Sequence, residues 1–285
     1  MDFTLTRYLY SKTEVYQSLF ISLLECQPEE SLYWAYENYF SGFEEEVVEY
    51  LRKIYTEIYA KENPKLSKFI ETTIEQWYKT PTQHHLIGSL VYTLAIRKYN
   101  LDEFVTNYFN TVCLPQEMKP ATKRRLIVYM EPEQIEPYYT IIDDKPRKIL
   151  QVAVKYRVRK YVNQLFKATE QPNEIYETPN RWLYFAANSP IWQKRIEEHG
   201  GKTNDETKTV YFESDDVADE FYGKWDYDFD EQPAEIKRYI CGEQPQINLK
   251  EFALRYGVNI IVKKNIKISS ITKPENLQNS ITYHP

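Results

Sequence analysis

The sequence predicts a mainly α-helical protein, in which a helical bundle or an irregular HEAT-like α-solenoid is followed by a smaller α+β part. Up to about residue 167, apolar residues recur at helical spacing. After about residue 180, prolines, a Gly-Gly pair and strand-type residues become frequent. We therefore predict two domains. Residues 1–168 form a helical, HEAT-like domain with a basic last helix, and residues 169–285 form a smaller acidic α+β domain with a loose C-terminal tail.

The first domain is expected to consist of successive helices with short connections, which pack as antiparallel neighbours. Ser11 and Glu14 have the spacing of a capping box, and Gly42 can end a helix in the left-handed conformation. Asn63 before a proline is a typical helix start. The expected helices are one that begins at Ser11, 29–40, 43–58, one that begins at Asn63, 86–94, 101–109 and 146–166.

The second domain mixes helices and strands. A helix over 191–198 is expected to end at Gly200-Gly201, and residues 207–212 have the composition of a strand. Asn248 and Glu251 again have capping-box spacing. Further helices are expected at 215–225, 233–240 and 248–256, and the apolar stretches 258–262 and 266–268 are expected to pair as a small ribbon.

Composition and spacing exclude several classes of function. The 7 glycines among 285 residues form neither a dinucleotide-binding pattern nor a P-loop. His84 and His85 are adjacent, so on a helix they would point in different directions and could not share a metal ion. We expect no catalytic residues, metal, cofactor or small-molecule ligand, although an enzyme whose site is not visible in one sequence stays a third hypothesis. The chain begins without a signal peptide and its apolar runs are too short to span a membrane, so we expect a cytosolic protein with reduced cysteines.

The most distinctive feature is a basic stretch between Lys145 and Lys167, which holds eight basic residues and no acidic one. On the expected 146–166 helix, one stripe is apolar and a separate stripe is basic, with Tyr156 beside it. This face could follow a phosphate backbone while Tyr156 stacks on a base, or it could bind an acidic protein surface. A solvated face without a partner and a face neutralised within the protein are the alternatives. The candidate binding residues are Arg147, Lys148, Lys155, Tyr156, Arg159 and Lys160, together with Lys123, Arg124 and Arg125 at the start of a preceding helix.

An acidic block between Glu213 and Glu231 holds nine acidic residues and one basic residue. It could dock on the basic helix within the same chain, or recruit another protein. Alternating aspartates resemble the start of an EF-hand loop, but the glycine and the distal glutamate of that loop are missing, so a solvated acidic loop is the favoured interpretation. The candidate interaction residues are Asp215, Asp216, Asp219, Glu220, Asp226, Asp228, Asp230 and Glu231.

Five segments resemble an uncharacterised protein family encoded by nucleocytoplasmic large DNA viruses, the giant viruses. They are 30–43, 54–64, 86–104, 189–192 and 229–233. Many family members carry Glu-Pro-Asp before a Glu-Gln-Pro motif, whereas residues 227–230 read Tyr-Asp-Phe-Asp here. The resemblance implies a viral protein of the infected cell's cytoplasm, at the virus factory or in the virion, and it brings no catalytic residues.

Together, these features favour a non-enzymatic scaffold or adaptor. Its basic helix would bind nucleic acid, with RNA favoured, or a viral or host protein of the nucleic-acid or translation machinery. If the helices stack as HEAT-type pairs, the architecture would be similar to the 4G-type scaffold of translation initiation. The alternative is a structural or internal virion protein, and no membrane partner is expected.

Overall fold

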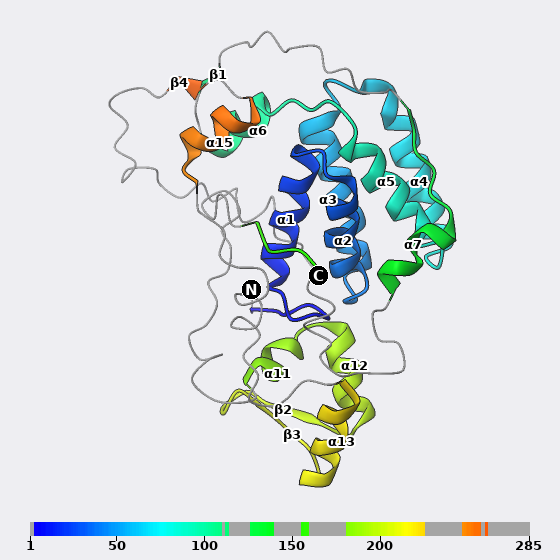
Figure 1. Cartoon of the computed structure of the whole chain (residues 1–285), viewed down its shortest axis with the longest axis vertical. Helices are drawn as coiled ribbons and strands as arrows, with labels where there is room; N and C mark the ends of the chain where they lie inside the picture. Colours follow the sequence, from blue (N-terminus) through cyan, green and yellow to red (C-terminus); the bar gives the residue numbers. More distant parts are fainter. Residues whose placement is uncertain are drawn as a thin grey trace.

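A computed structural model describes residues 3–109, 112–113, 126–139, 155–159, 181–225, 247–257 and 260–261. The protein is mainly helical, and its described residues also form two small two-stranded sheets (Figure 1). This confirms the predicted fold class. Among the described helices, none combines the length and the apolar character that crossing a membrane requires.

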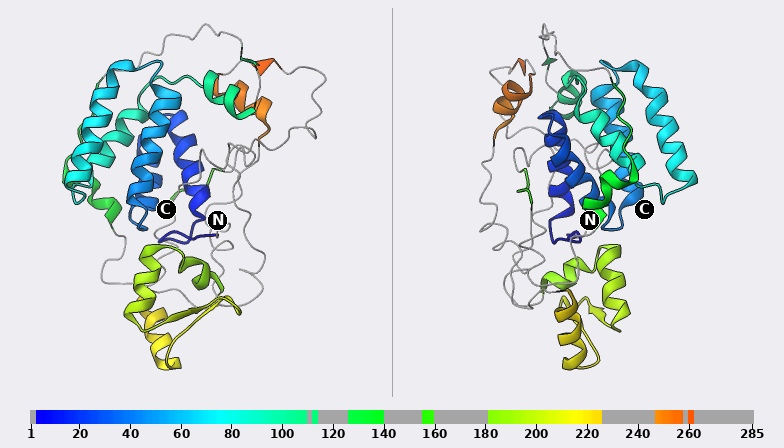
Figure 2. Two further views of the ribbon diagram at one scale, coloured as in Figure 1. Left: turned by 180° about the vertical axis from the view of Figure 1, so that it is seen from behind. Right: turned by 45° about the vertical axis from the view of Figure 1, so that its right-hand side comes forward.

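The first five helices form a bundle, in which they lie side by side (Figures 1 and 2). The central helix contacts its sequence neighbours and also α5, more than 45 residues later in the chain. In a solenoid, each unit contacts only its neighbours along the chain, so this packing is that of a bundle. The helices are α1 (Lys12–Leu24), α2 (Pro28–Tyr39), which is the central one, α3 (Glu44–Ile54), α4 (Ser67–Lys79) and α5 (His85–Ala95).

Two of the predicted helix caps are wrong, although both helices begin close to the predicted residues. Ser11 is the residue before α1, but its side chain makes no capping hydrogen bond. It instead forms a β-bridge with Leu5, which holds the N-terminal segment in a tight hook. The side chain of Asn63 donates to the carbonyl oxygens of Tyr59 (2.9 Å) and Lys98 (2.7 Å). At Asn63, a long-range partner, the Lys98 carbonyl, thus takes the side chain that the predicted cap would use.

Residues 181–225 form a small α+β unit at one end of the bundle (Figures 1 and 2). Strands β2 and β3 pair antiparallel, and the predicted strand and two predicted helices of this region are confirmed. The unit is fastened to the N-terminal hook by Trp192 Nε1, which donates to the Thr6 carbonyl at 3.0 Å. It is also bound to the turn after α2, because the Ile191 N–H donates to the Ser41 carbonyl at 3.2 Å. Its elements are α11 (Arg181–Ala186), α12 (Pro190–Glu198), β2 (Lys202–Asn204), β3 (Thr209–Tyr211) and α13 (Asp215–Trp225).

A later segment returns to the bundle. Helix α15 (Leu249–Tyr256) begins with the predicted capping box of Asn248 and Glu251. Strand β4 (Ile260–Ile261) pairs antiparallel with β1 (Val112–Cys113), which follows α6 (Asp102–Phe109). The first domain is therefore not entirely helical, and the described partner of 258–262 is β1. The expected ribbon partner 266–268, the expected helix 233–240 and the domain boundary at 168 lie outside the described residues.

Candidate protein-binding site

The basic helix predicted over 146–166 is wrong where the structure describes it. Residues 155–159 are not helical. Their exposure alternates instead: Lys155 and Arg157 are exposed, whereas Tyr156 and Val158 are half-buried. An alternation with a period of two is typical of an extended segment. The candidate residues Lys123, Arg124, Arg125, Arg147, Lys148 and Lys160 lie outside the described residues.

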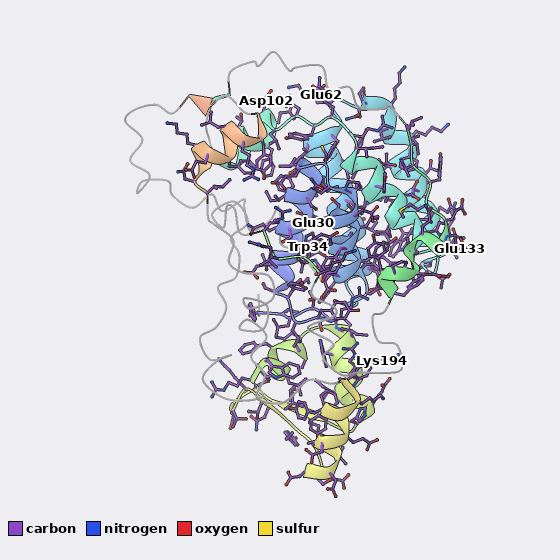
Figure 3. The ribbon with its side chains drawn as sticks, in the orientation of Figure 1. Glu30, Trp34, Glu62, Asp102, Glu133 and Lys194 are labelled. Atoms are coloured by element: carbon purple, nitrogen blue, oxygen red, sulfur yellow. The ribbon has the colours of Figure 1, made fainter. Side chains whose placement is uncertain are left out.

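Arg159 is neutralised by carboxylates at the α1–α2 corner. Its guanidinium donates to both carboxylate oxygens of Glu30, at 2.8 and 2.6 Å, and lies 3.2 Å from Glu25. Its backbone N–H donates to Ser18 Oγ at 2.8 Å. Figure 3 shows Glu30 one turn before Trp34, whose indole N–H donates to the same carboxylate at 3.1 Å. Arg159 is thus a structural residue that fastens the 155–159 segment to α1 and α2.

Tyr156 is also engaged within the protein. Its ring packs against Tyr33 (ring centroids 5.1 Å apart) and Trp34 (6.4 Å). Burial raises the pKa of its hydroxyl. The predicted stacking of this ring on a nucleic-acid base would have to compete with these two contacts. Lys155 is exposed, and its ammonium lies 5.5 Å from the Tyr156 ring.

In the described part of the acidic block, Glu213 is exposed just before α13, and Asp215, Asp216, Asp219 and Glu220 are exposed on α13. The carboxylates that bind Arg159 include Glu25 and Glu30, which come from a different part of the chain. The remaining members of the block, Asp226, Asp228, Asp230 and Glu231, lie outside the described residues.

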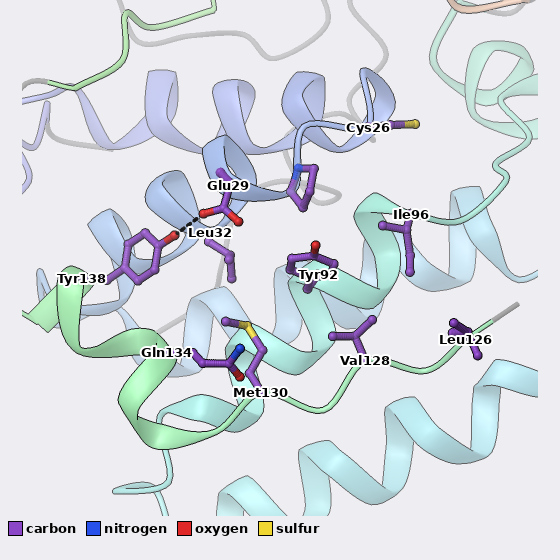
Figure 4. Close-up of a pocket in the computed structure, with 11 residues that line it drawn as sticks. Cys26, Glu29, Leu32, Tyr92, Ile96, Leu126, Val128, Met130, Gln134 and Tyr138 are labelled. Carbon is purple, nitrogen blue, oxygen red and sulfur yellow. Dashed lines mark hydrogen bonds between the residues drawn. The ribbon is translucent and has the colours of Figure 1, made fainter. Parts of the chain in front are cut away.

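A groove of about 720 Å³ opens between α2, α5 and the chain around α7 (Pro132–Tyr139) (Figure 4). Its walls are largely apolar, with polar groups at one end. There the Tyr138 hydroxyl donates to Glu29 at 3.2 Å, and burial, then the nearby Glu29 charge, raises the pKa of Tyr138. We call it the α2/α5 groove, and its lining residues are Cys26, Pro28, Glu29, Leu32, Tyr92, Ile96, Leu126, Val128, Met130, Gln134 and Tyr138.

One wall of the groove is the 126–130 segment, which runs extended and antiparallel along α5 (Figure 4). Three side chains spaced four residues apart bind its backbone: Ser89 and Thr93 on α5, and Arg97 just after the end of this helix. The Val128 N–H donates to Thr93 Oγ1 at 3.0 Å, and this hydroxyl lies 3.3 Å from the Val128 carbonyl oxygen, to which it donates. The flanking bonds run from Arg97 Nη2 to the Leu126 carbonyl oxygen (2.7 Å) and from the Met130 N–H to Ser89 Oγ (2.8 Å).

The spacing of every fourth side chain on α5 matches the spacing of every second residue in the extended segment. Four helical residues rise about 6.0 Å along the axis, and two residues of extended chain cover about 6.6 to 6.8 Å. Side chains at every fourth position of α5 can therefore reach every second residue of the 126–130 segment. The segment is held by one edge, as it would be by a neighbouring strand.

The opposite edge of the segment is free. Neither Ile127 nor Tyr129, both within the described 126–139 stretch, forms a backbone hydrogen bond. In an extended chain, the N–H and C=O groups of alternate residues point to opposite edges, so these groups point away from α5. The side chains are exposed as well: Leu126 is 57% and Tyr129 is 70% exposed. We call the free edge, its exposed side chains and the adjoining α2/α5 groove the 126–130 surface.

Sequence analysis did not identify this surface. The signals were present, because Leu126 to Met130 is a run of five apolar residues rich in strand-forming types, and Ser89 and Thr93 interrupt an apolar helix at a spacing of four. Each signal alone fits a buried strand or an ordinary helix. Comparison of the chain with protein-family models, with curated proteins and with solved structures finds no significant match.

Proposed function

We propose that the chain is a scaffold or adaptor without a reaction of its own, and that it binds another protein through the 126–130 surface. The observation that carries this proposal is an ordered extended segment that exposes apolar side chains and one unpaired backbone edge beside an apolar groove. Contiguous exposed apolar patches bordered by polar residues often mark interaction sites, whereas single exposed apolar residues are common on any protein surface.

The contacts of the basic residues favour this protein-binding role over nucleic-acid binding. Arg159 is neutralised by Glu30 and Glu25, and Tyr156 is packed against α2. Exposed phosphate contacts of the basic stretch would then depend on Lys155, on Arg157 and on basic residues outside the described stretches. In the family that the sequence resembles, the role would be that of a viral protein in the infected cell.

Affinity purification with quantitative mass spectrometry tests this proposal. We expect Leu126→Glu and Tyr129→Thr to lose protein partners that the wild-type chain retains, whether or not nuclease is added. The chain offers matched controls far from the surface in sequence: Leu254, which is 71% exposed on α15, and Tyr211, which is 52% exposed on β3. Leu254→Glu and Tyr211→Thr should retain the partners.

Two results would count against the proposal. One is retention of the same partners by all four variants. The other is loss of every partner after nuclease treatment. This loss would show that nucleic acid bridges the chain to its partners, and it would favour nucleic-acid binding through the basic residues.

A further inference from the structure

We propose that a second copy of this chain binds the 126–130 surface, so that the two 126–130 segments pair antiparallel about a two-fold axis at Val128. This inference rests on the proposed function, because it names the partner of the same surface. It is carried by the free backbone edge, by the side chains on that edge and by the charges that flank it.

The hydrogen-bonding groups fit this register. In an antiparallel ladder, two opposite residues exchange both of their N–H···O=C bonds, and the next pair along exchanges none. The groups that lack partners belong to Ile127 and Tyr129. When Ile127 lies opposite the partner's Tyr129, Tyr129 necessarily lies opposite the partner's Ile127. Both pairs can then exchange two hydrogen bonds, and Val128 faces its own copy as the pair that exchanges none.

The side chains fit the same register. Paired residues on adjacent strands project from the same face of the sheet. Each Tyr129 ring would pack on a β-branched Ile127, a cross-strand pair that contributes roughly 0.2 to 1 kcal/mol relative to two alanines. On the other face, the groove-lining Leu126 would lie beside the partner's Met130, so that the α2/α5 grooves of both copies meet in one apolar surface.

Charge favours antiparallel over parallel pairing of the two copies. Two exposed acidic residues, Glu131 and Glu133, follow the segment. Antiparallel pairing sets these carboxylates of the two copies at opposite ends of the ladder. A parallel pairing would bring like charges together.

The association state of the full chain tests the inference, with sedimentation equilibrium over a range of concentrations as the measurement. We expect a reversible dimer. Tyr129→Pro removes an N–H that makes no hydrogen bond within the chain, and proline is tolerated on strand edges. It also removes a ring that is 70% exposed and contacts Phe69 of α4 at 5.7 Å between ring centroids, so its denaturant unfolding midpoint is compared with that of the wild type. It should weaken dimerisation by about tenfold or more, because two of the bonds between copies are lost. Tyr129→Phe, which keeps the ring and the N–H, should dimerise like the wild type.

Cysteine cross-linking tests the register. A pair that exchanges no hydrogen bonds has its Cα atoms about 4.5 Å apart, which suits a disulfide. Val128→Cys should therefore form a covalent dimer under mild oxidation. In Tyr129→Cys, the two new thiols would be diagonal neighbours with Cα atoms about 7 to 8 Å apart, so cross-linking should be much weaker. The wild-type chain with its three natural cysteines gives the background.

The results separate this inference from the proposed function. A chain that stays monomeric at all concentrations, or one in which Tyr129→Cys cross-links as well as Val128→Cys, overturns the second-copy pairing. If Leu126→Glu still loses its protein partners in that case, the proposed function stands with a different partner. If the wild type is monomeric and Leu126→Glu retains every partner, both fail.

Discussion

The hydroxyl of Thr93 holds the centre of the 126–130 segment, and Thr93→Val removes it while keeping the shape of the side chain. Thr93 is fully buried. Its Oγ1 accepts from the Val128 N–H at 3.0 Å and donates to the Val128 carbonyl oxygen, 3.3 Å away. The substitution leaves a donor and an acceptor of Val128 without their partner. Its effect therefore measures how firmly α5 fixes the segment.

The magnitude follows from the burial of the groups involved. One neutral hydrogen bond contributes about 1 kcal/mol, and a buried group left without a partner costs about 1 to 3 kcal/mol. Val128 is half-buried, so water can reach part of its backbone once the segment shifts. We expect the free energy of unfolding to fall by about 2 kcal/mol, and local opening at Val128 to become about 30-fold more frequent.

Denaturant unfolding and amide hydrogen exchange measure these two quantities. The midpoint of unfolding should fall without a change in the denaturant slope, because the surface exposed on unfolding is unchanged. In dilute wild-type protein, the amides of Val128 and Met130 should be protected, whereas those of Ile127 and Tyr129 should exchange freely. In Thr93→Val, the protection at Val128 should be lost.

A second buried threonine provides the control. The Thr73 hydroxyl on α4 donates to the Phe69 carbonyl of its own helix at 2.7 Å, so Thr73→Val leaves no tertiary group without a partner. We expect a change within about 0.5 kcal/mol. Equal effects of the two substitutions, or equal exchange at Val128 and Ile127 in the dilute wild type, would refute the reasoning that α5 holds one edge of the segment.

Three further expectations test other contacts of the fold. Glu37→Gln removes the buried carboxylate that binds Arg7 at 3.0 Å and should lower the free energy of unfolding by about 3 kcal/mol, measured by denaturant unfolding. Gly42→Ala should cost about 1 to 3 kcal/mol in the same assay, because Gly42 has a φ of +96° and an added Cβ would lie 2.5 Å from Pro190. Burial lowers the pKa of His84 below its ordinary 6.5, so the folded state binds this proton less tightly than the unfolded state does. Stability should therefore decline as the pH falls below about 6.5, and a thermal unfolding series should show a smaller decline for His84→Gln.

The sequence predicted those elements whose signals are local. The helix expected over 215–225 has the observed bounds, and the capping box of Asn248 and Glu251 forms because this helix start is exposed and has no competing partner. The same type of signal failed at Ser11 and Asn63. Ser11 pairs through its backbone with Leu5, and the Asn63 side chain binds the Lys98 carbonyl of another segment, and a local capping pattern contains neither contact.

The helix expected over 146–166 failed for a related reason. Its apolar residues fit a helical spacing, but Tyr156 and Val158 also fit a period of two. The choice between them depends on Glu30 and Ser18, which are 129 and 141 residues away from Arg159. The pairing of β1 with β4 likewise joins two short apolar stretches about 150 residues apart, and neither stretch specifies the other.

The 126–130 surface shows why such a site escapes sequence motifs. It needs two patterns at once: hydrogen-bonding side chains at every fourth position of α5, and a strand-forming run elsewhere in the chain. Because α5 satisfies one edge of the run through side chains, it also fixes which edge faces away from α5. The backbone groups of Ile127 and Tyr129 then repeat with the period of a strand and make no hydrogen bond within the described residues. A second extended segment supplies matching donors and acceptors at that period, and the run from Ile127 to Tyr129 is itself such a segment.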